Sequence, residues 1–453
     1  MSDIDTNLNN TEEQTATKNV RLKCDTEGEK YTIFETFVGV GGSHLGFKNC
    51  GFVSKYVNDF CPEAIECLLY NNPEIKKTAY VDNRSILEIN PSELLQKTNL
   101  QEKDLDVLFG GIVCKGFSLA GERSPNDERN YFYHKQLEIV KYVKPKISII
   151  ENVPGIKSAE VLDEKTPKDL RNKVDLMWQE LENYKGEKAK LRKKNLVTSD
   201  FEAKGQLLRK NKIKLMNQLK SEGYLKSVYR DILDLYEKLG YRVYANILNS
   251  ACYGAATKRE RIIIVAVRND IKIDFNFPQA KYGNNIFIKK YPYLYNDKNK
   301  ILPLKTVNEA LSIIDYTDIS DIDNQPMKHS EKTIERFKHI PEGDNIANHM
   351  DSVPDDLKIS KYYSRGNTMR LNGNDASPTL VPGHSNFPVH PKLHRSITVR
   401  EAACITGFPS NYKFFGSHTK RCEEVGNAVP PPLSTAIAME VKRLLDKYYQ
   451  NLK

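Results

Sequence analysis

Cys114 and Glu151 are the residues of this chain whose types and spacing most directly suggest chemistry. Each follows a short apolar run, Asp106–Phe109 for the cysteine and Lys146–Ile150 for the glutamate. If both runs are buried parallel strands, they place a thiol and a carboxyl group at the same edge of the sheet, where open α/β sheets bind ligands. A thiolate adds to an electron-poor ring, and a neighbouring carboxyl group can protonate or hydrogen-bond the ring nitrogen that takes up charge.

The elements needed to position this pair can be predicted around it. Asn130–Val143 has apolar residues at helical spacing and stops before Pro145, so a helix should connect the two strands. Taken alone, Cys114 can equally be interpreted as a buried loop thiol without a chemical role, and Glu151 as a surface residue at the end of a strand. The rest of the chain has to decide between these interpretations.

A glycine-rich turn follows the first predicted strand, Tyr31–Phe37, in the segment FVGVGGSHLGF (37–47). Such a turn lets a nucleotide-like ligand approach the backbone closely. The dinucleotide fingerprint GxGxxG does not fit, because His44 stands at the third glycine position.

Acidic residues follow the next two predicted strands. Asp59 and Phe60 come after Phe52–Val57, and Asp82 and Asn83 come after Ala79–Val81. A carboxylate at the tip of the second strand is placed to accept hydrogen bonds from ribose hydroxyls, with an aromatic ring beside it for a base. The alternative is that Asp59 belongs to the N-cap region of the following helix.

Two arginines precede a very apolar predicted strand, Ile262–Val267. Residues two apart in an extended chain lie on the same side, so Arg259 and Arg261 are expected to face the cleft together, one of them holding the carbonyl of a bound base or Glu151. Surface arginines at a strand entry are the alternative.

A long insertion, about 157–224, carries two apolar stripes separated by a lysine-rich segment. Residues 170, 174, 177, 181 and 184 form the first stripe, and 208, 215 and 219 form the second. This pattern predicts a projecting two-helix hairpin. Its charged surface either grips DNA phosphates or a partner, or is simply solvated.

Composition limits the class of protein. The chain has 453 residues, 39% hydrophobic and 28% charged, with a net charge of +9, which is compatible with a polyanionic partner. Residues 1–30 are polar and are expected to be a disordered tail. No apolar run is long enough to span a membrane and no signal peptide is present, so a cytoplasmic protein is expected. The eight cysteines lack zinc-like spacing; we expect reduced thiols and no metal site.

Several segments together resemble the motifs of the cytosine-C5 DNA methyltransferases. They occur in the family's order: FVGVGGSHLGF (37–47), GGIVCKGFS (110–118), ENVPG (151–155), YGAATKRER (253–261) and VGNAV (425–429). The resemblance implies a Rossmann-like α/β methyltransferase domain. It also implies a smaller, irregular, strand-rich target-recognition domain, which the Pro-, Asn-, Tyr- and Lys-rich segment 269–394 would form.

The resemblance also implies roles for individual residues. Catalysis would rest on Cys114, Glu151, Arg259 and Arg261. S-adenosyl-L-methionine would be held by Phe37, Gly39, Val40, Gly41, Gly42, Asp59, Phe60, Asp82, Asn83 and Asn427. The flipped cytosine would be contacted by Val113, Lys115, Ser118 and Asn152.

The implied organisation is a catalytic domain at 31–268 containing the insertion, a recognition domain at 269–394, and a return segment at 395–453 that completes the catalytic domain. The implied function is sequence-specific methylation of cytosine C5 in double-stranded DNA. The enzyme would act as a monomer on DNA in a restriction-modification system, with a cognate endonuclease acting separately.

Three departures from the family pattern keep alternatives open. Val113 replaces the family's proline before the nucleophile, Lys115 replaces a glutamine after it, and Ala256-Thr257 replaces Pro-Gln. Proline would restrict the backbone of the loop, so valine leaves it less preorganised. A catalytically impaired DNA-binding regulator and a transfer-RNA cytosine-5 methyltransferase are the alternative functions.

Overall fold

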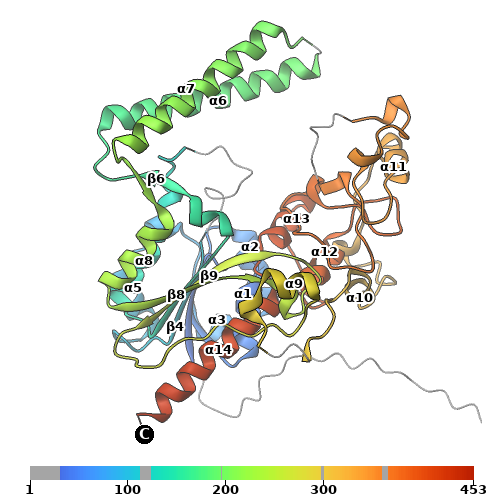
Figure 1. The fold of residues 1–453 in the computed structure, drawn as a ribbon. Helices are drawn as coiled ribbons and strands as arrows, with labels where there is room; N and C mark the ends of the chain where they lie inside the picture. The colour runs from blue at the N-terminus through green and yellow to red at the C-terminus, as the bar shows by residue number, and fades with distance from the viewer. Residues whose placement is uncertain (1–30, 113–123, 195, 297–299, 360–365, 453) are drawn as a thin grey trace, which may run out of the picture.

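A seven-stranded, mostly parallel sheet forms the centre of the fold (Figure 1). The computed structural model describes residues 31–112, 124–194, 196–296, 300–359 and 366–452. The strand order is β3-β2-β1-β4-β5-β9-β8, and β9 runs antiparallel to both of its neighbours. The strands are β1 (Thr32–Thr36), β2 (Val53–Asn58), β3 (Tyr80–Asp82), β4 (Val107–Gly111), β5 (Ile147–Asn152), β8 (Tyr241–Asn249) and β9 (Glu260–Arg268).

The register of β4 against β5 determines how close the carboxyl ends of these two strands lie. These two parallel strands pair so that Gly111 lies opposite Glu151. The chain therefore leaves β4 towards Cys114 directly beside the glutamate, as the two apolar runs predicted. Phe109 and Ile149 on these strands are fully buried.

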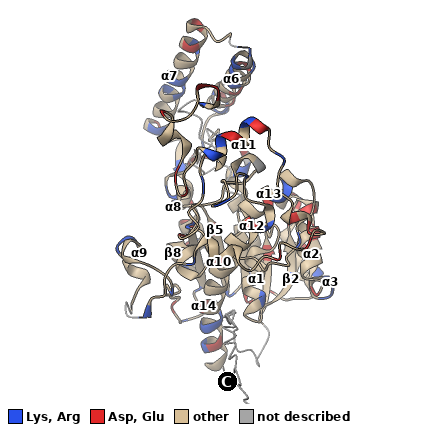
Figure 2. Ribbon diagram, turned by 90° about the vertical axis from the view of Figure 1, so that its right-hand side faces the viewer, with Lys and Arg blue, Asp and Glu red and all other residues tan. Residues whose placement is uncertain are grey.

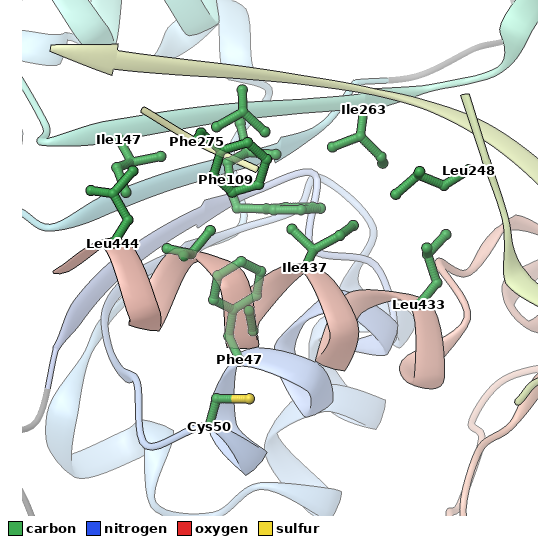
Figure 3. Packing of buried hydrophobic residues seen from close by; sticks show 14 of the residues in the cluster. Phe47, Cys50, Phe109, Ile147, Leu248, Ile263, Phe275, Leu433, Ile437 and Leu444 are labelled. Atoms are coloured by element: carbon green, nitrogen blue, oxygen red, sulfur yellow. The ribbon is translucent and has the colours of Figure 1, made fainter. Parts of the chain in front are cut away.

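One face of the sheet is covered by helices from opposite ends of the chain. α1 (Gly42–Asn49) and α14 (Pro431–Gln450) pack on this face, and Figure 3 shows Phe47 of α1 and Ile437 of α14 against Phe109 of β4. The C-terminal helix thus packs on the same face of the sheet as the first helix of the chain.

The other face is covered by α5 (Phe132–Val143) and α8 (Val228–Lys238). Successive residues of a strand point to opposite faces, so the continuous apolar runs are buried on both sides. Shorter helices, α2 (Pro62–Asn71), α3 (Ile75–Thr78) and α4 (Leu94–Thr98), accompany the β2–β3 edge. The predicted α/β fold is confirmed.

The insertion is a helical hairpin that stands clear of the sheet (Figure 1 and Figure 2). It consists of α6 (Lys168–Lys193) and α7 (Ser199–Ser221), and the predicted stripe residues Val174 and Leu181 are buried between them. At its base, β6 (Glu160–Leu162) pairs with β7 (Leu225–Ser227). β7 continues directly into α8, which begins at Val228.

The segment 269–394 is irregular, but the expectation that it is strand-rich is wrong for its described residues. They form α9 (Asn285–Lys290), α10 (Val307–Leu311), α11 (Glu331–Lys338), short 3-10 turns and isolated bridges. A buried arginine replaces strand hydrogen bonds here: the guanidinium of Arg370 donates to the carbonyl oxygens of Phe337, Ile340, His390 and Leu393.

This irregular segment is bound to the return segment by buried charges. Arg400 of α12 (Val399–Thr406) forms ion pairs with Asp321 and Asp323, and Asp323 also pairs with Arg421 of α13 (His418–Asn427). The two parts are therefore held in a fixed relation. In the described part of the chain, no helix combines the length and apolarity that crossing a membrane requires.

Candidate functional site

A cavity of about 460 Å³ opens at the carboxyl edge of the sheet. Its wall combines the ends of β1, β2, β4 and β5 with one side of α13. Eight of the residues predicted to act in the site line it: Phe37, Gly39, Val40, Asp59, Phe60, Glu151, Arg261 and Asn427. The sequence motifs therefore meet in one cavity although they lie up to about 390 residues apart in the chain.

An ion pair forms the floor of the cavity. The Nε atom of Arg261 lies 2.7 Å from Oε1 of Glu151, and both side chains are more than nine-tenths buried. The pair joins β9 to β5 across their antiparallel ladder. A buried carboxyl group held in this way can accept a hydrogen bond from an exocyclic amine and, when protonated, donate one to a ring nitrogen.

Asn152, predicted to bind substrate, points elsewhere. Its Nδ2 donates to the carbonyl oxygen of Ile112 at 3.1 Å, and its side chain does not line the cavity. It therefore fixes the backbone immediately before Val113. Val113, Cys114, Lys115 and Ser118 lie outside the described residues.

The glycine-rich turn presents open backbone to the cavity. Gly39 has a φ of +54° and no atom within 4 Å of where a Cβ would stand. Its N–H donates to Oδ2 of Asp59 at 2.8 Å, while Oδ1 of Asp59 accepts from the backbone N–H of Cys61. Burial raises the pKa of Asp59, although both hydrogen bonds oppose that rise. The side chain of Phe60 remains 65% exposed beside it.

Gly41 and Gly42, predicted as cofactor residues, serve packing instead. A Cβ on Gly42 would stand 2.1 Å from the carbonyl oxygen of Val429, and neither glycine lines the cavity. Gly41 has a φ of +88°, which favours glycine. Gly42 thus lets the start of α1 approach Val429 just before α14, while Gly41 lets the chain turn into α1 beside Leu68 and Tyr412.

Asp82 and Asn83 are also not part of the cavity wall, which at this point consists of Ser85 and Ile86. Burial raises the pKa of Asp82, but the hydrogen bonds and charge of Arg84 outweigh burial and lower it. Arg84 holds the carboxylate through two bonds of 2.9 and 2.7 Å, and Tyr56 donates a third. Asp82 stands at the predicted strand tip, but the structure turns its carboxylate onto its neighbour.

Arg259 does not face Glu151 as expected. Its guanidinium donates to the carbonyl oxygens of Gly426 at 2.6 Å and Asn427 at 3.1 Å. It is absent from the cavity wall, so its contribution to the site is to hold the loop that carries Asn427. Arg261 is the arginine that forms the ion pair with Glu151.

Sequence reasoning missed the contribution of α13. Lys420, Glu423 and Glu424 of this helix line the cavity together with Phe132 of α5. Burial raises the pKa of Glu424 to about 7, and its Oε1 has no hydrogen-bond partner within the described chain. The run HTKRCEEVGN (418–427) is mostly charged and shows no apolar stripe, so no periodicity indicated a buried helix.

The functional groups that line the described part of the cavity are carboxylates, a guanidinium group and unobstructed backbone at Gly39. They contain no group of three or more His, Cys, Asp or Glu side chains arranged to hold a metal ion. The six described cysteines are free and buried.

A comparison with models of protein families identifies the family of this chain. The family model for C-5 cytosine-specific DNA methylases matches residues 31–184 and 214–443. The chain belongs to this family. The predicted family and enzyme class are thereby confirmed.

Curated relatives of this methylase match over nearly its whole length. The type II methyltransferase M.NgoFVII of Neisseria gonorrhoeae is 26% identical over 433 residues, covering 94% of this chain and 91% of the relative. The type II methyltransferase M.DdeI of Desulfomicrobium norvegicum is 24% identical, covering 93% and 89%.

Solved structures support the fold of the methylase. A candidate DNA modification methyltransferase encoded within an E. coli prophage matches with a TM-score of 0.58 and 20% identity, covering 92% of this chain and 100% of that one. A Spodoptera frugiperda DNMT2 mutant matches with a TM-score of 0.51 and 13% identity, covering 91% and 100%.

Proposed function

We propose that this methylase transfers a methyl group from S-adenosyl-L-methionine to C5 of a cytosine within a specific sequence of duplex DNA. The observation that carries the proposal is the buried Glu151–Arg261 pair beside the end of β4. β4 leads directly to Cys114, so the nucleophile and the carboxylate belong to adjoining strand ends.

The other half of the cavity fits the cofactor. Gly39 offers backbone that no side chain obstructs, the Asp59 carboxylate suits ribose hydroxyls, and exposed Phe60 provides a face for a base. Phe37 lies against Phe132 at a ring distance of 5.8 Å and lines the same wall. When bound, S-adenosyl-L-methionine supplies an electrophilic methyl group.

The residues of the chain prepare the cytosine for that transfer. The base is flipped out of the duplex because its ring is inaccessible in the stack, at a cost of a few kcal/mol. The Cys114 thiolate forms a bond to C6, and Glu151 holds N3 and the exocyclic amine while the electron pair moves towards C5. Arg261 keeps Glu151 in place. After C5 is methylated it loses its proton, the C6–S bond breaks, and the thiolate is restored.

Recognition of the target sequence is assigned to segment 269–394, whose basic, aromatic and amide side chains suit phosphates and base edges. Segment 395–453 completes the catalytic domain through α13 and α14. The relatives are type II methyltransferases. By analogy, we assign this enzyme to protection of DNA in a restriction-modification system, with a separate endonuclease and a monomer acting on DNA.

A comparison of substrates tests the proposal. Purified enzyme is given labelled S-adenosyl-L-methionine with either unmethylated duplex DNA or transfer RNA, and products are resolved as 5-methylcytosine with their sequence context. Label at C5 in one short DNA motif is expected. Label in transfer RNA alone would replace the proposed substrate. Sequence-specific DNA binding without any label would favour an impaired regulator, for which Val113→Pro is the direct rescue variant.

A further inference from the structure

The positive charge of this chain is concentrated in the end of α6 and along nearly all of α7. Residues 185–220 hold twelve Lys and Arg against three Asp and Glu, a net of +9, which equals the net charge of the whole chain. The remaining residues are therefore neutral in sum. Figure 2 shows Lys and Arg along both hairpin helices. Most of this stretch, 185–213, lies between the two segments that match the family.

Few of these charges are neutralised within the hairpin. Lys188 pairs with Glu202, and Lys212 lies 5.0 Å from the ring centre of Trp178. From Ala203 to Ser221, α7 contains no acidic residue, and Lys210 and Lys214 on it are exposed. Like charges held on one helix repel each other, and a polyanion laid against them removes that repulsion.

The apolar side of the hairpin is already occupied by its own core. Val174 and Trp178 of α6 pack with Leu219 of α7. The basic residues share the outward surface of the hairpin with separate exposed apolar side chains at Leu176, Leu207 and Ile213, while the main apolar stripe is already buried. This favours a partner recognised by charge, which for a DNA methylase is the phosphate backbone.

The base of the hairpin fixes its direction relative to the catalytic cavity. Arg171 donates to Oδ1 of Asn126 at 3.0 Å, and the amide of Asn126 donates to Asp175 at 3.0 Å. Asn126 lies twelve residues after Cys114 on the segment that returns from the nucleophile to α5. In Figure 1 the hairpin and the irregular segment around α11 both rise above the carboxyl edge of the sheet.

We propose that residues 185–220, the end of α6 together with nearly all of α7, bind backbone phosphates of the DNA duplex that flanks the target site. The proposal rests on duplex DNA being the substrate, as proposed above. With 23 residues at about 1.5 Å per residue, α7 is roughly 35 Å long, a length of about ten base pairs. The hairpin thus extends the DNA contact on one side without reading bases.

Charge reversal on the exposed face of α7 tests this. Lys210→Glu/Lys214→Glu removes two phosphate contacts and leaves the hairpin core intact. The matched control is Lys76→Glu/Lys77→Glu, two exposed lysines on α3, which precedes β3 and so lies at the opposite edge of the sheet. Dissociation constants are measured between about 50 and 200 mM salt for duplexes carrying the target with short or long flanks.

For the hairpin variant we expect the slope of log affinity against log salt to fall by roughly 2 relative to wild type, with at least tenfold weaker binding to long duplexes. Lengthening the flank should no longer improve its affinity. The α3 control should keep the wild-type slope and flank effect. A wild-type salt slope in the hairpin variant would overturn the proposal. That result is also expected if the basic surface binds RNA or an acidic protein in place of DNA.

Single-turnover methylation separates this outcome from failure of the function itself. At saturating concentration of a short duplex, the hairpin variant should methylate at the wild-type rate. An inactive wild type would refute the proposed function, whereas an active wild type with an unaffected hairpin variant would refute only the role of the hairpin.

Discussion

Arg261 and Glu151 meet 2.7 Å apart at the floor of the cavity, each from a different strand of the central sheet. Because both are more than nine-tenths buried, neither charge has water to replace its partner. The orientation of the carboxylate towards a base therefore depends on the arginine. This relation distinguishes the pair from Arg259, two residues earlier, which has a different partner.

Changes at this pair should lower turnover more than binding. Glu151→Gln keeps the shape but removes the charge and the transferable proton, so kcat should fall by about 100-fold or more. Arg261→Lys keeps the charge but loses the planar guanidinium and should cost about 10- to 100-fold. Single-turnover rates with the DNA dissociation constant check both. Unchanged rates with Glu151→Gln would exclude Glu151 from the reaction.

Arg259 should act on the cofactor side. Arg259→Ala leaves the carbonyl oxygens of Gly426 and Asn427 without their donor, at about 1–3 kcal/mol. The loop carrying Asn427 should then loosen, raising KM for S-adenosyl-L-methionine about tenfold with a smaller change in kcat. Arg259→Lys should restore part of this. A loss confined to kcat at unchanged KM would instead place Arg259 at the reacting base.

Alanine substitutions at Gly42 and Gly186 should have opposite effects on stability, because Gly42 lies in a close contact and Gly186 does not. Gly42→Ala would put a Cβ 2.1 Å from the carbonyl oxygen of Val429, so we expect a loss of about 1–3 kcal/mol in the free energy of unfolding. Gly186 lies within α6 with open space around it, and Gly186→Ala should stabilise by about 0.5–1 kcal/mol. Denaturant unfolding measures both. Equal effects would contradict the close approach of α1 to α14.

Glu424 should make stability depend on pH. Burial raises its pKa to about 7, above the ordinary value of 4.5, so the folded protein retains a proton that the unfolded chain releases. This stabilisation is complete below about pH 4.5 and is lost as the pH rises through 7. Relative to Glu424→Gln, wild type should therefore lose roughly 3 kcal/mol across this window. If the free energies of unfolding of wild type and Glu424→Gln changed in parallel with pH, the pKa of Glu424 would not be raised in the folded protein.

The elements and motifs that depend on local pattern were predictable from sequence. Buried parallel strands have continuous apolar sequences. The two apolar runs therefore predicted β4 and β5 and the proximity of their carboxyl ends. The hairpin followed from its two apolar stripes. The cavity residues Asp59 and Phe60 were found because they directly follow a strand.

The side-chain directions that depend on distant partners were not predictable. Arg259 precedes the first residue of β9, so strand alternation does not relate its direction to that of Arg261. Asp82 has an arginine two residues later that satisfies its carboxylate. The charged helix α13 is buried because Arg421 pairs with Asp323, 98 residues away. In the irregular segment, Arg370 donates to the carbonyl oxygens of Ile340 and Phe337, which lie 30 and 33 residues away, and no local pattern indicates these contacts.

The measurement that tests the account most directly compares wild type with Cys114→Ala. Both are mixed with duplex DNA and labelled S-adenosyl-L-methionine, and methyl transfer and DNA binding are followed together. The account predicts 5-methylcytosine at one sequence with wild type, and no product with Cys114→Ala although it binds the same DNA. Methylation at C5 by the Cys114→Ala variant at the wild-type rate would contradict the proposed nucleophile and the site built around it.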